Sequence, residues 1–245
     1  MSAGLEAALR ARLASGGRCF VPYVTGGYPG VDADLLLALQ DAGADAIEVG
    51  VPFSDPVMDG GVIQEASAAS LEAGTTPSHV RATIEKAALD VPVAVMTYAN
   101  PMFRPGFDAS VDEAKRAGVA GIIVPDLPFD EADDWIAACR AREVATVFLA
   151  APGESAERLA GIARASTGFL YCVSTFGVTG ARDRLADTAG ELVASLRAMT
   201  DLPLLIGVGI GTPEQAAEAC SFADGVVVGS ALMAELLAGN PDGAV

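Results

Sequence analysis

Two carboxylates, Glu48 and Asp59, are the residues of this sequence best suited to acid–base chemistry. Glu48 lies near the end of a short apolar run, and Asp59 follows in a loop rich in glycine and proline. A carboxylate in a buried strand is costly unless it has a partner or a chemical role. Strand alternation places Glu48 on the same face as Ala46 and Gly50. If that face lines a barrel, Glu48 points into the top of its interior.

Each of these carboxylates also has a purely structural alternative. Glu48 could accept hydrogen bonds from loop amides, and Asp59 could be a turn residue before Gly60. Asp55 and Asp126 also stand at the ends of predicted strands, and Asp55 is better suited to bracing its own loop. The pairing of Glu48 with Asp59 favours the acid–base interpretation, because paired carboxylates in different environments divide acid and base roles.

Glycine-rich segments after three late strands indicate a phosphate site. They are residues 177–180, 207–211 and 229–230. Glycine lets the backbone approach an anion closely, and Ser230 adds a hydroxyl at a helix amino terminus. In barrels, the loops after strands seven and eight commonly hold phosphate. The structural alternative is that α/β loops are generally rich in glycine. Residues 212–215, Thr-Pro-Glu-Gln, predict a helix start with a capping box.

The residues that are scarce narrow the chemistry. The two lysines, Lys86 and Lys115, fall within helical patterns, which disfavours a Schiff-base mechanism. The one histidine, His79, stands in a helix-start context and is predicted to be a surface helix residue. The four cysteines form no CxxC pair, which favours free thiols over a disulfide framework or zinc site. We therefore expect no metal site.

The net charge of −17 is spread along the chain and disfavours binding to nucleic acid or to anionic membranes. An anionic substrate would have to be captured locally by backbone N–H groups. No apolar run approaches the roughly 20 residues that span a bilayer. Residues 2–14 are amphipathic and are predicted to form a helix, not a signal peptide. A soluble, cytoplasmic protein is expected.

Short apolar runs alternate with helical patterns along the whole chain, which predicts parallel strands with helical crossovers. Eight such strands favour an α/β fold of the (β/α)8 TIM-barrel type. A capping helix at residues 2–14 and an extra helix at 77–89, after strand two, complete the prediction, and residues 1–245 are expected to form a single domain. The predicted strands are residues 18–25, 46–51, 93–98, 120–124, 145–150, 168–173, 203–208 and 224–228.

Several of these motifs together resemble the tryptophan synthase alpha subunit family. The most specific is Glu48-Val-Gly-Val-Pro-Phe-Ser-Asp-Pro56, joined by Tyr98-Ala-Asn-Pro101, Pro125-Asp-Leu-Pro128, Gly177-Val-Thr-Gly180 and Gly229-Ser230. The resemblance runs from about Phe20 to the last predicted helix. Two departures lie beside the site: Tyr28 stands where the family often has Asp, and Gly61 where Pro is usual.

The resemblance implies a carbon–carbon lyase of tryptophan biosynthesis that cleaves indole-3-glycerol phosphate to indole and glyceraldehyde 3-phosphate. The lack of a usable lysine or metal site fits this retro-aldol reaction, because a C3-protonated indole supplies its own electron sink. By resemblance, Glu48 is the acid–base group, Asp59 holds the indole N–H, and Tyr171 orients Glu48. Which proton each carboxylate moves is left open by the sequence.

The resemblance implies binding roles for further residues. The phosphate would be bound by Gly180, Gly209, Gly229 and Ser230, while Phe20 and Met96 would line the indole pocket. The loops that carry Asp59 and Thr179 would close over the substrate.

The family's alpha subunit works with a beta subunit in an alpha2-beta2 heterotetramer, and indole passes between them through a tunnel. Pyridoxal phosphate is expected only in the beta subunit, and no cofactor in this chain. The interface is expected around Asp55 and residues 98–103, where Met102 and Phe103 would otherwise be exposed in a loop. Two alternatives stay open: another barrel enzyme of phosphosugars, such as an isomerase or stand-alone lyase, and a catalytically weak regulatory subunit.

Overall fold

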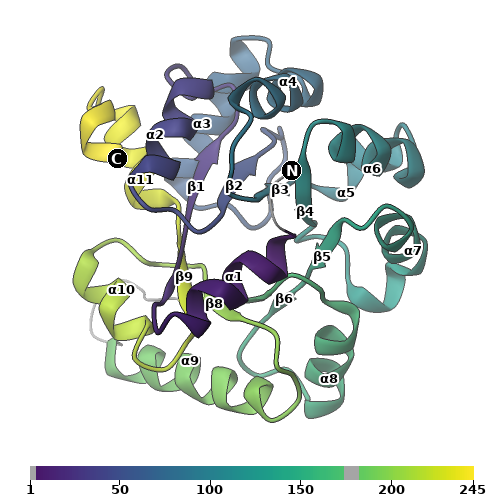
Figure 1. The fold of residues 1–245 in the computed structure, drawn as a ribbon, viewed down its shortest axis with the longest axis vertical. Coiled ribbons are helices and arrows are strands. Elements are labelled where there is room, and N and C mark those ends of the chain that lie inside the picture. Colours follow the sequence, from purple (N-terminus) through teal and green to yellow (C-terminus); the bar gives the residue numbers. More distant parts are fainter. Residues whose placement is uncertain (1–3, 174–181) are drawn as a thin grey trace.

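A parallel β-sheet forms the centre of the molecule (Figure 1). The computed structural model describes residues 4–173 and 182–245. Within them the sheet has nine strands in the order β5-β4-β3-β2-β1-β9-β8-β7-β6. The strands are β1 Cys19–Thr25, β2 Ile47–Gly50, β3 Val93–Met96, β4 Val119–Ile123, β5 Ala145–Val147, β6 Leu149–Ala150, β7 Leu170–Cys172, β8 Leu204–Ile206 and β9 Gly225–Val228.

The sheet closes into a barrel through the predicted fifth strand. Strand β5 pairs with β4, whereas β6 pairs with β7, and Phe148 alone separates the two. The Phe148 carbonyl still accepts the Tyr171 N–H at 3.1 Å, so the ladder continues across the interruption. Strands β5 and β6 are therefore two halves of the predicted strand at residues 145–150. The predicted (β/α)8 TIM barrel is confirmed.

Helices surround the barrel, and α1 (Leu5–Ala14) crosses its amino-terminal end (Figure 1). Leu5 and Leu9 of α1 are buried, and a side chain at Gly121 or Gly168 would press against Leu5. This confirms the capping helix. The other α-helices on the predicted plan are α2 Ala33–Asp41, α3 Gly61–Glu72, α4 Pro77–Ala87, α6 Phe107–Arg116, α7 Asp133–Ala141, α8 Ala156–Ala165, α9 Arg182–Arg197, α10 Pro213–Ala219 and α11 Ser230–Leu237. Helix α4 is the extra helix expected after strand two.

Three short helical segments differ from the sequence prediction. Helix α5 (Ala99–Phe103) replaces a predicted loop, because the Ala99 N–H donates to Asp126 Oδ1 at 2.8 Å. That cap comes from a different loop, so local sequence does not reveal it. The predicted helix at 129–142 is divided at Ala132 into the 3₁₀ turn η1 (Phe129–Glu131) and α7. A second turn, η2 (Pro241–Ala244), follows α11.

Two capping boxes begin helices where the sequence places them. At α10, Thr212 and Gln215 satisfy each other's backbone N–H groups, as predicted. At α4, Thr76 and His79 form the equivalent pair, and His79 Nδ1 accepts the Thr76 N–H at 3.3 Å. The predicted placement of His79 on the surface of a helix is confirmed.

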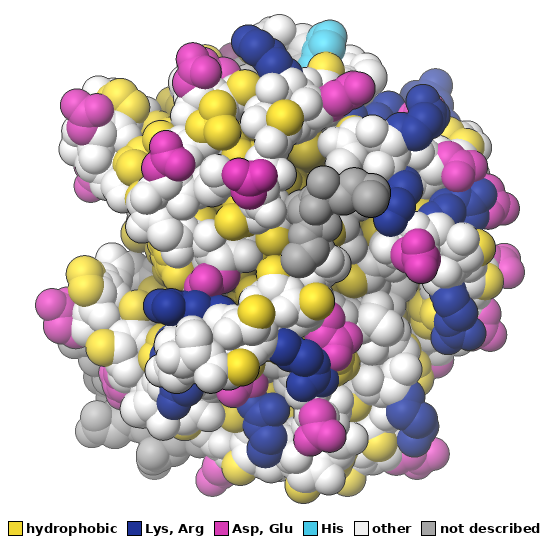
Figure 2. Space-filling view, viewed as in Figure 1, with side chains coloured by type: hydrophobic (Ala, Val, Ile, Leu, Met, Phe, Trp, Pro, Cys, Tyr) yellow, Lys and Arg dark blue, Asp and Glu magenta, His cyan; other side chains and the backbone are white. Residues whose placement is uncertain are grey.

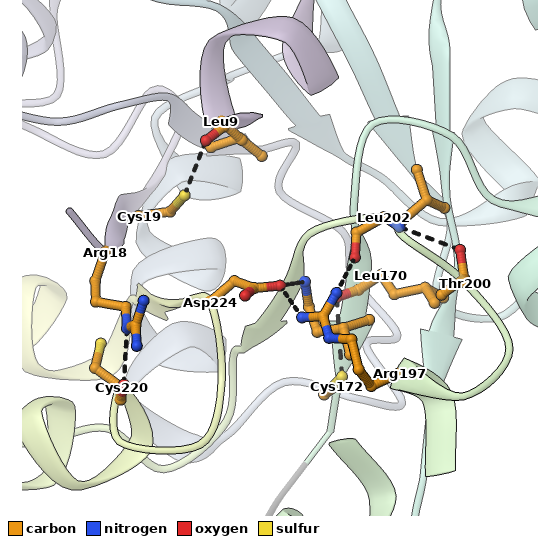
Figure 3. Close-up of polar contacts among 11 residues, drawn as sticks. Leu9, Arg18, Cys19, Leu170, Cys172, Arg197, Thr200, Leu202, Cys220 and Asp224 are labelled. Carbon is orange, nitrogen blue, oxygen red and sulfur yellow. Dashed lines mark hydrogen bonds and ion pairs between the residues drawn. The ribbon is translucent and has the colours of Figure 1, made fainter. Parts of the chain in front are cut away.

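Polar contacts tie the elements at the end of the barrel where the strands begin (Figure 3). Arg18 Nε donates to the Cys220 carbonyl at 2.9 Å, and Asp224 meets Arg197 and the Leu204 N–H. All four cysteines are free, as predicted. Burial raises the pKa of the Cys19 thiol to about 12, so it stays protonated at neutral pH.

We propose that residues 1–245 form one domain, because strands from both halves of the chain share one sheet. On the face over α1, basic and acidic side chains are interspersed (Figure 2). Within the described ranges, no helix is both long and apolar enough to cross a membrane.

Candidate active site

A pocket at the carboxyl ends of the barrel strands brings together most of the residues expected from the sequence. Its lining includes Glu48, Asp59, Met96, Tyr171, Gly209, Gly229 and Ser230. These residues come from β2, β3, β7, the loops after β2, β8 and β9, and the first residue of α11. Phe20 is not part of the lining. Thr179 and Gly180 lie outside the described residues. The geometry therefore places the two carboxylates and the glycines of two late loops around one space.

Glu48 is completely buried in β2 and faces this pocket. Neither of its carboxyl oxygens has a hydrogen-bond partner within the described part of the chain. The alternative in which loop amides hold Glu48 is therefore wrong for these residues. Burial raises the pKa of Glu48 to about 8, and the negative charge of Asp59 adds to the shift. At neutral pH the Glu48 carboxyl is mostly protonated, and it can donate a proton into the pocket.

Two buried tyrosines share the pocket with Glu48. Tyr23 of β1 is the register partner of Glu48 across the β1–β2 ladder. Tyr171 was expected to bond to Glu48, but its hydroxyl donates to the Gly207 carbonyl at 2.8 Å. Burial raises the pKa of both phenols, so both keep their protons at neutral pH.

Glycines explain where these two phenols lie. A side chain at Gly207 would overlap the ring of Tyr171, and one at Gly50 would overlap the phenol of Tyr23. The absence of a side chain at Gly207 lets Tyr171 reach the backbone carbonyl of β8's following loop. This close approach is the physical reason why Tyr171 pairs with a carbonyl and not with Glu48.

Asp59 is half-buried in the loop that follows β2. Burial raises its pKa, while a hydrogen bond with the Tyr98 hydroxyl acts in the opposite direction. Gln64 Nε2 donates to the Asp59 carbonyl at 2.7 Å, which ties the loop to α3. Asp55 is exposed and accepts the Ser54 hydroxyl at 2.5 Å, which agrees with a loop-bracing role.

The loops after β8 and β9 form another part of the pocket wall. Gly209 has φ +81°, a conformation that favours glycine. Gly229 and Ser230 stand at the amino terminus of α11, where backbone N–H groups point outward. No lysine or arginine lines the described part of the pocket. An anion there would be met by backbone N–H groups, the helix dipole and the Ser230 hydroxyl.

Sequence reasoning missed Tyr23 and chose Phe20 instead. The two residues are three positions apart in β1, so their side chains point to opposite faces of the strand. Phe20 lies in the first half of the strand, and its N–H donates to Asp45 Oδ2 at 2.8 Å. Strand alternation counted back from the end of β1 would have favoured Tyr23. Tyr98 was also missed, because its contact with the Asp59 loop is not local.

The fold and the pocket define the class of this chain: it is a (β/α)8-barrel enzyme. The family model of the tryptophan synthase alpha chain matches residues 9–243. The chain is 44% identical over 224 residues to the tryptophan synthase alpha chain of Mycobacterium bovis (strain BCG / Pasteur 1173P2), covering 90% of this chain and 83% of the relative. Identity to the Prochlorococcus marinus (strain MIT 9313) alpha chain is 42% over 233 residues, covering 93% and 85%.

Solved structures agree with the sequence comparison. Tryptophan synthase of Mycobacterium tuberculosis in space group F222 superposes with a TM-score of 0.89 at 40% identity, covering 100% of this chain and 95% of that one. The alpha subunit from Legionella pneumophila str. Paris gives a TM-score of 0.90 at 31% identity, covering 99% and 95%. The chain belongs to the tryptophan synthase alpha chain family, which confirms the resemblance. It is an enzyme subunit for the alpha reaction of tryptophan synthase, a lyase step of tryptophan biosynthesis.

Proposed function

We propose that this pocket cleaves indole-3-glycerol phosphate to indole and glyceraldehyde 3-phosphate, with Glu48 as the acid–base group. The observation that carries the proposal is the buried Glu48 carboxyl, which faces the pocket without a partner among the described residues. Its raised pKa, about 8, keeps a proton available at neutral pH. A general acid works best when its pKa lies near the operating pH.

The proposed reaction needs no outside proton source. The Glu48 carboxyl protonates C3 of the indole ring, and the positive charge moves onto the ring nitrogen. The resulting Glu48 carboxylate accepts the proton of the glyceryl hydroxyl next to the scissile bond. As the aldehyde forms, the carbon–carbon bond breaks and its electron pair returns to the ring, which restores indole. Glu48 ends the cycle protonated, as it began.

Asp59 is proposed to stabilise the charge that develops on the indole ring. Its carboxylate, on the edge of the same pocket, would accept the indole N–H and offset the positive charge of the protonated ring. Tyr171 is proposed to hold the space around Glu48 through its packing and its bond to Gly207. Met96 and Tyr23 are proposed as walls for the indole ring, with Tyr23 in place of Phe20.

The phosphate is proposed to bind at Gly209, Gly229 and Ser230 of the same pocket, with Gly180 as a further contributor. The amino terminus of α11 supports this assignment, because N–H groups and the helix dipole there favour an anion. The loops that carry Asp59 and Thr179 are proposed to close over bound substrate and exclude water.

A beta subunit is the proposed partner, in an alpha2-beta2 heterotetramer of the cytoplasm. Exposed apolar side chains on the loop after β2 and on α5 support this: Val57 is 73% exposed, Met58 47% and Phe103 55%. Met102, which was expected to be exposed with Phe103, is buried on the inner side of α5. Pyridoxal phosphate is assigned to the partner, because Lys86 and Lys115 lie on α4 and α6 and not in the pocket.

The test is indole release from indole-3-glycerol phosphate, measured with and without beta subunit for wild type and for Glu48→Gln. Glutamine keeps the size of Glu48 but cannot supply the proton, so kcat is expected to fall by about a thousandfold or more. Glu157→Gln, on the exposed surface of α8, is the matched control and should keep wild-type turnover. Near-normal turnover by Glu48→Gln would refute the role of Glu48. A wild-type chain that releases no indole but activates a beta subunit would favour the regulatory alternative.

A further inference from the structure

Tyr98 is a buried tyrosine next to the loop that carries Asp59, and it has no role in the reaction proposed above. It is only 2% exposed and stands between β3 and α5, at the N-cap position of α5. Its ring stacks on that of Phe53, with centroids 5.0 Å apart and planes at 26°. Phe53 belongs to the loop after β2, the loop that also carries Asp59. The stack therefore holds the phenol against this loop.

The Tyr98 hydroxyl contacts two groups of the Asp59 loop at once. It accepts the Met58 N–H at 3.2 Å, which fixes the backbone next to Asp59, and interaction with the same hydroxyl lowers the pKa of the Asp59 carboxyl. Because the phenol oxygen accepts from Met58, its own proton is left to donate to the carboxylate. One hydroxyl thus constrains both the backbone at residue 58 and the side chain at residue 59.

The residue that follows Tyr98 is bonded to the next barrel loop. The N–H of Ala99 donates to Asp126 Oδ1 at 2.8 Å, which fixes the start of α5. Asp126 follows β4, so the loop after β4 is bonded to the residue next to Tyr98, while Tyr98 itself contacts the loop after β2. Burial raises the pKa of Tyr98 to about 12, and its hydroxyl therefore keeps its proton at neutral pH.

We propose that Tyr98 is a positioning residue for Asp59: its hydroxyl holds the Asp59 carboxylate where it can meet the indole N–H. This inference rests on the proposed function and adds a residue that acts on the substrate only through Asp59. A hydrogen bond to a charged group contributes more than one between neutral groups. Loss of the hydroxyl should therefore affect the state of Asp59 more than the stability of the fold.

The test compares wild type with Tyr98→Phe, which keeps the stack on Phe53 and removes only the hydroxyl. In the indole-release assay, kcat is expected to fall about ten- to a hundredfold, with a smaller change in KM. The hydrogen bond lowers the pKa of Asp59, so its loss should raise that pKa and move the acidic limb of the pH–rate profile to higher pH. Tyr28→Phe, in the β1–α2 loop outside the pocket lining, is the matched control.

Titration of the Asp59 carboxyl carbon by NMR in the same variants gives a readout that does not depend on turnover. An upward shift in Tyr98→Phe but not in Tyr28→Phe supports the proposal. Wild-type kcat in Tyr98→Phe, or reduced kcat with an unshifted Asp59 titration, would overturn it. If the wild-type chain released no indole, the proposed function would fail, and the NMR titration alone would decide whether Tyr98 acts on Asp59.

Discussion

Burial of the Glu48 carboxyl costs solvation free energy, and no hydrogen bond from the described residues offsets that cost. The carboxyl has no hydrogen-bond partner among the described residues, and its nearest charged neighbour, Asp59, has the same sign. Both features disfavour the ionised form, which is why the pKa rises. An arrangement that raises the pKa of a carboxyl toward neutrality suits proton transfer, and it stabilises the folded chain less than an uncharged side chain would.

This cost predicts a pH-dependent stability difference between wild type and Glu48→Gln. In the unfolded chain Glu48 ionises near its ordinary pKa of 4.5, and in the folded chain near 8. Between these values the folded state binds more protons, so the free energy of unfolding of wild type should fall as pH rises, by at most about 1.4 kcal/mol per pH unit. Glutamine does not titrate. Urea denaturation should show that the free energy of unfolding of Glu48→Gln, relative to that of wild type, is higher at pH 8.5 than at pH 5. A constant difference between the two would contradict the assignment.

Glycines at the ends of β2 and β8 leave room for the two tyrosine side chains of the pocket. Gly50 ends β2 and leaves room for Tyr23, while Gly207 follows β8 and leaves room for Tyr171. A side chain at either position would meet the aromatic ring across the ladder. The backbone at Gly50 and at Gly207 therefore shapes the pocket, because it lets the rings of Tyr23 and Tyr171 approach closely.

Gly207→Ala is expected to displace the Tyr171 ring and break its hydroxyl bond to the carbonyl of residue 207. Overpacking of this kind typically costs about 1–3 kcal/mol of stability. We expect a lower unfolding midpoint and reduced indole release, measured by thermal denaturation and by the turnover assay. Gly190→Ala, in α9 with open space around the added methyl, is the control and should be neutral or slightly stabilising. Equal behaviour of the two variants would refute the steric argument.

At the scale of the whole molecule, the closed barrel brings distant segments to one end. The loop after β2 meets the loops after β8 and β9 because β1 pairs with both β2 and β9. The same end carries exposed apolar side chains on the β2 loop and on α5. Such surfaces commonly mark interaction sites, and here they adjoin the loop that carries Asp59.

Phe103→Ser is expected to weaken binding of the beta subunit. Phe103 is largely exposed on α5, so its loss removes apolar contact area, and an aromatic anchor of this kind contributes about 2 kcal/mol at a protein interface. Calorimetric titration with beta subunit should give a Kd raised by about tenfold or more. Leu37→Ser, a partly exposed apolar residue on α2, is the control and should bind as wild type does. Unchanged affinity for Phe103→Ser would place the interface elsewhere.

The sequence by itself determined most of the helices and strands and singled out the two carboxylates, Glu48 and Asp59. Period-two alternation put Glu48 on the inner face of β2, and the capping motif at residues 212–215 located the start of α10. These features depend on neighbours within about four residues, so local patterns are sufficient to predict them. The family motifs indicated the reaction, because each is a contiguous run of residues that can be recognised without the structure.

Tertiary structure alone decided how the side chains of the pocket pair. Tyr171 bonds to a carbonyl 36 positions away along the chain, and Tyr98 reaches a loop 40 positions before it. Asp126 of the next loop accepts the Ala99 N–H at the start of α5, and Met102 of this helix is buried. Each outcome depends on how neighbouring strands and loops come together, and for Tyr171 also on the space left by Gly207. These contacts are set when the barrel closes, and no local pattern of residues encodes them.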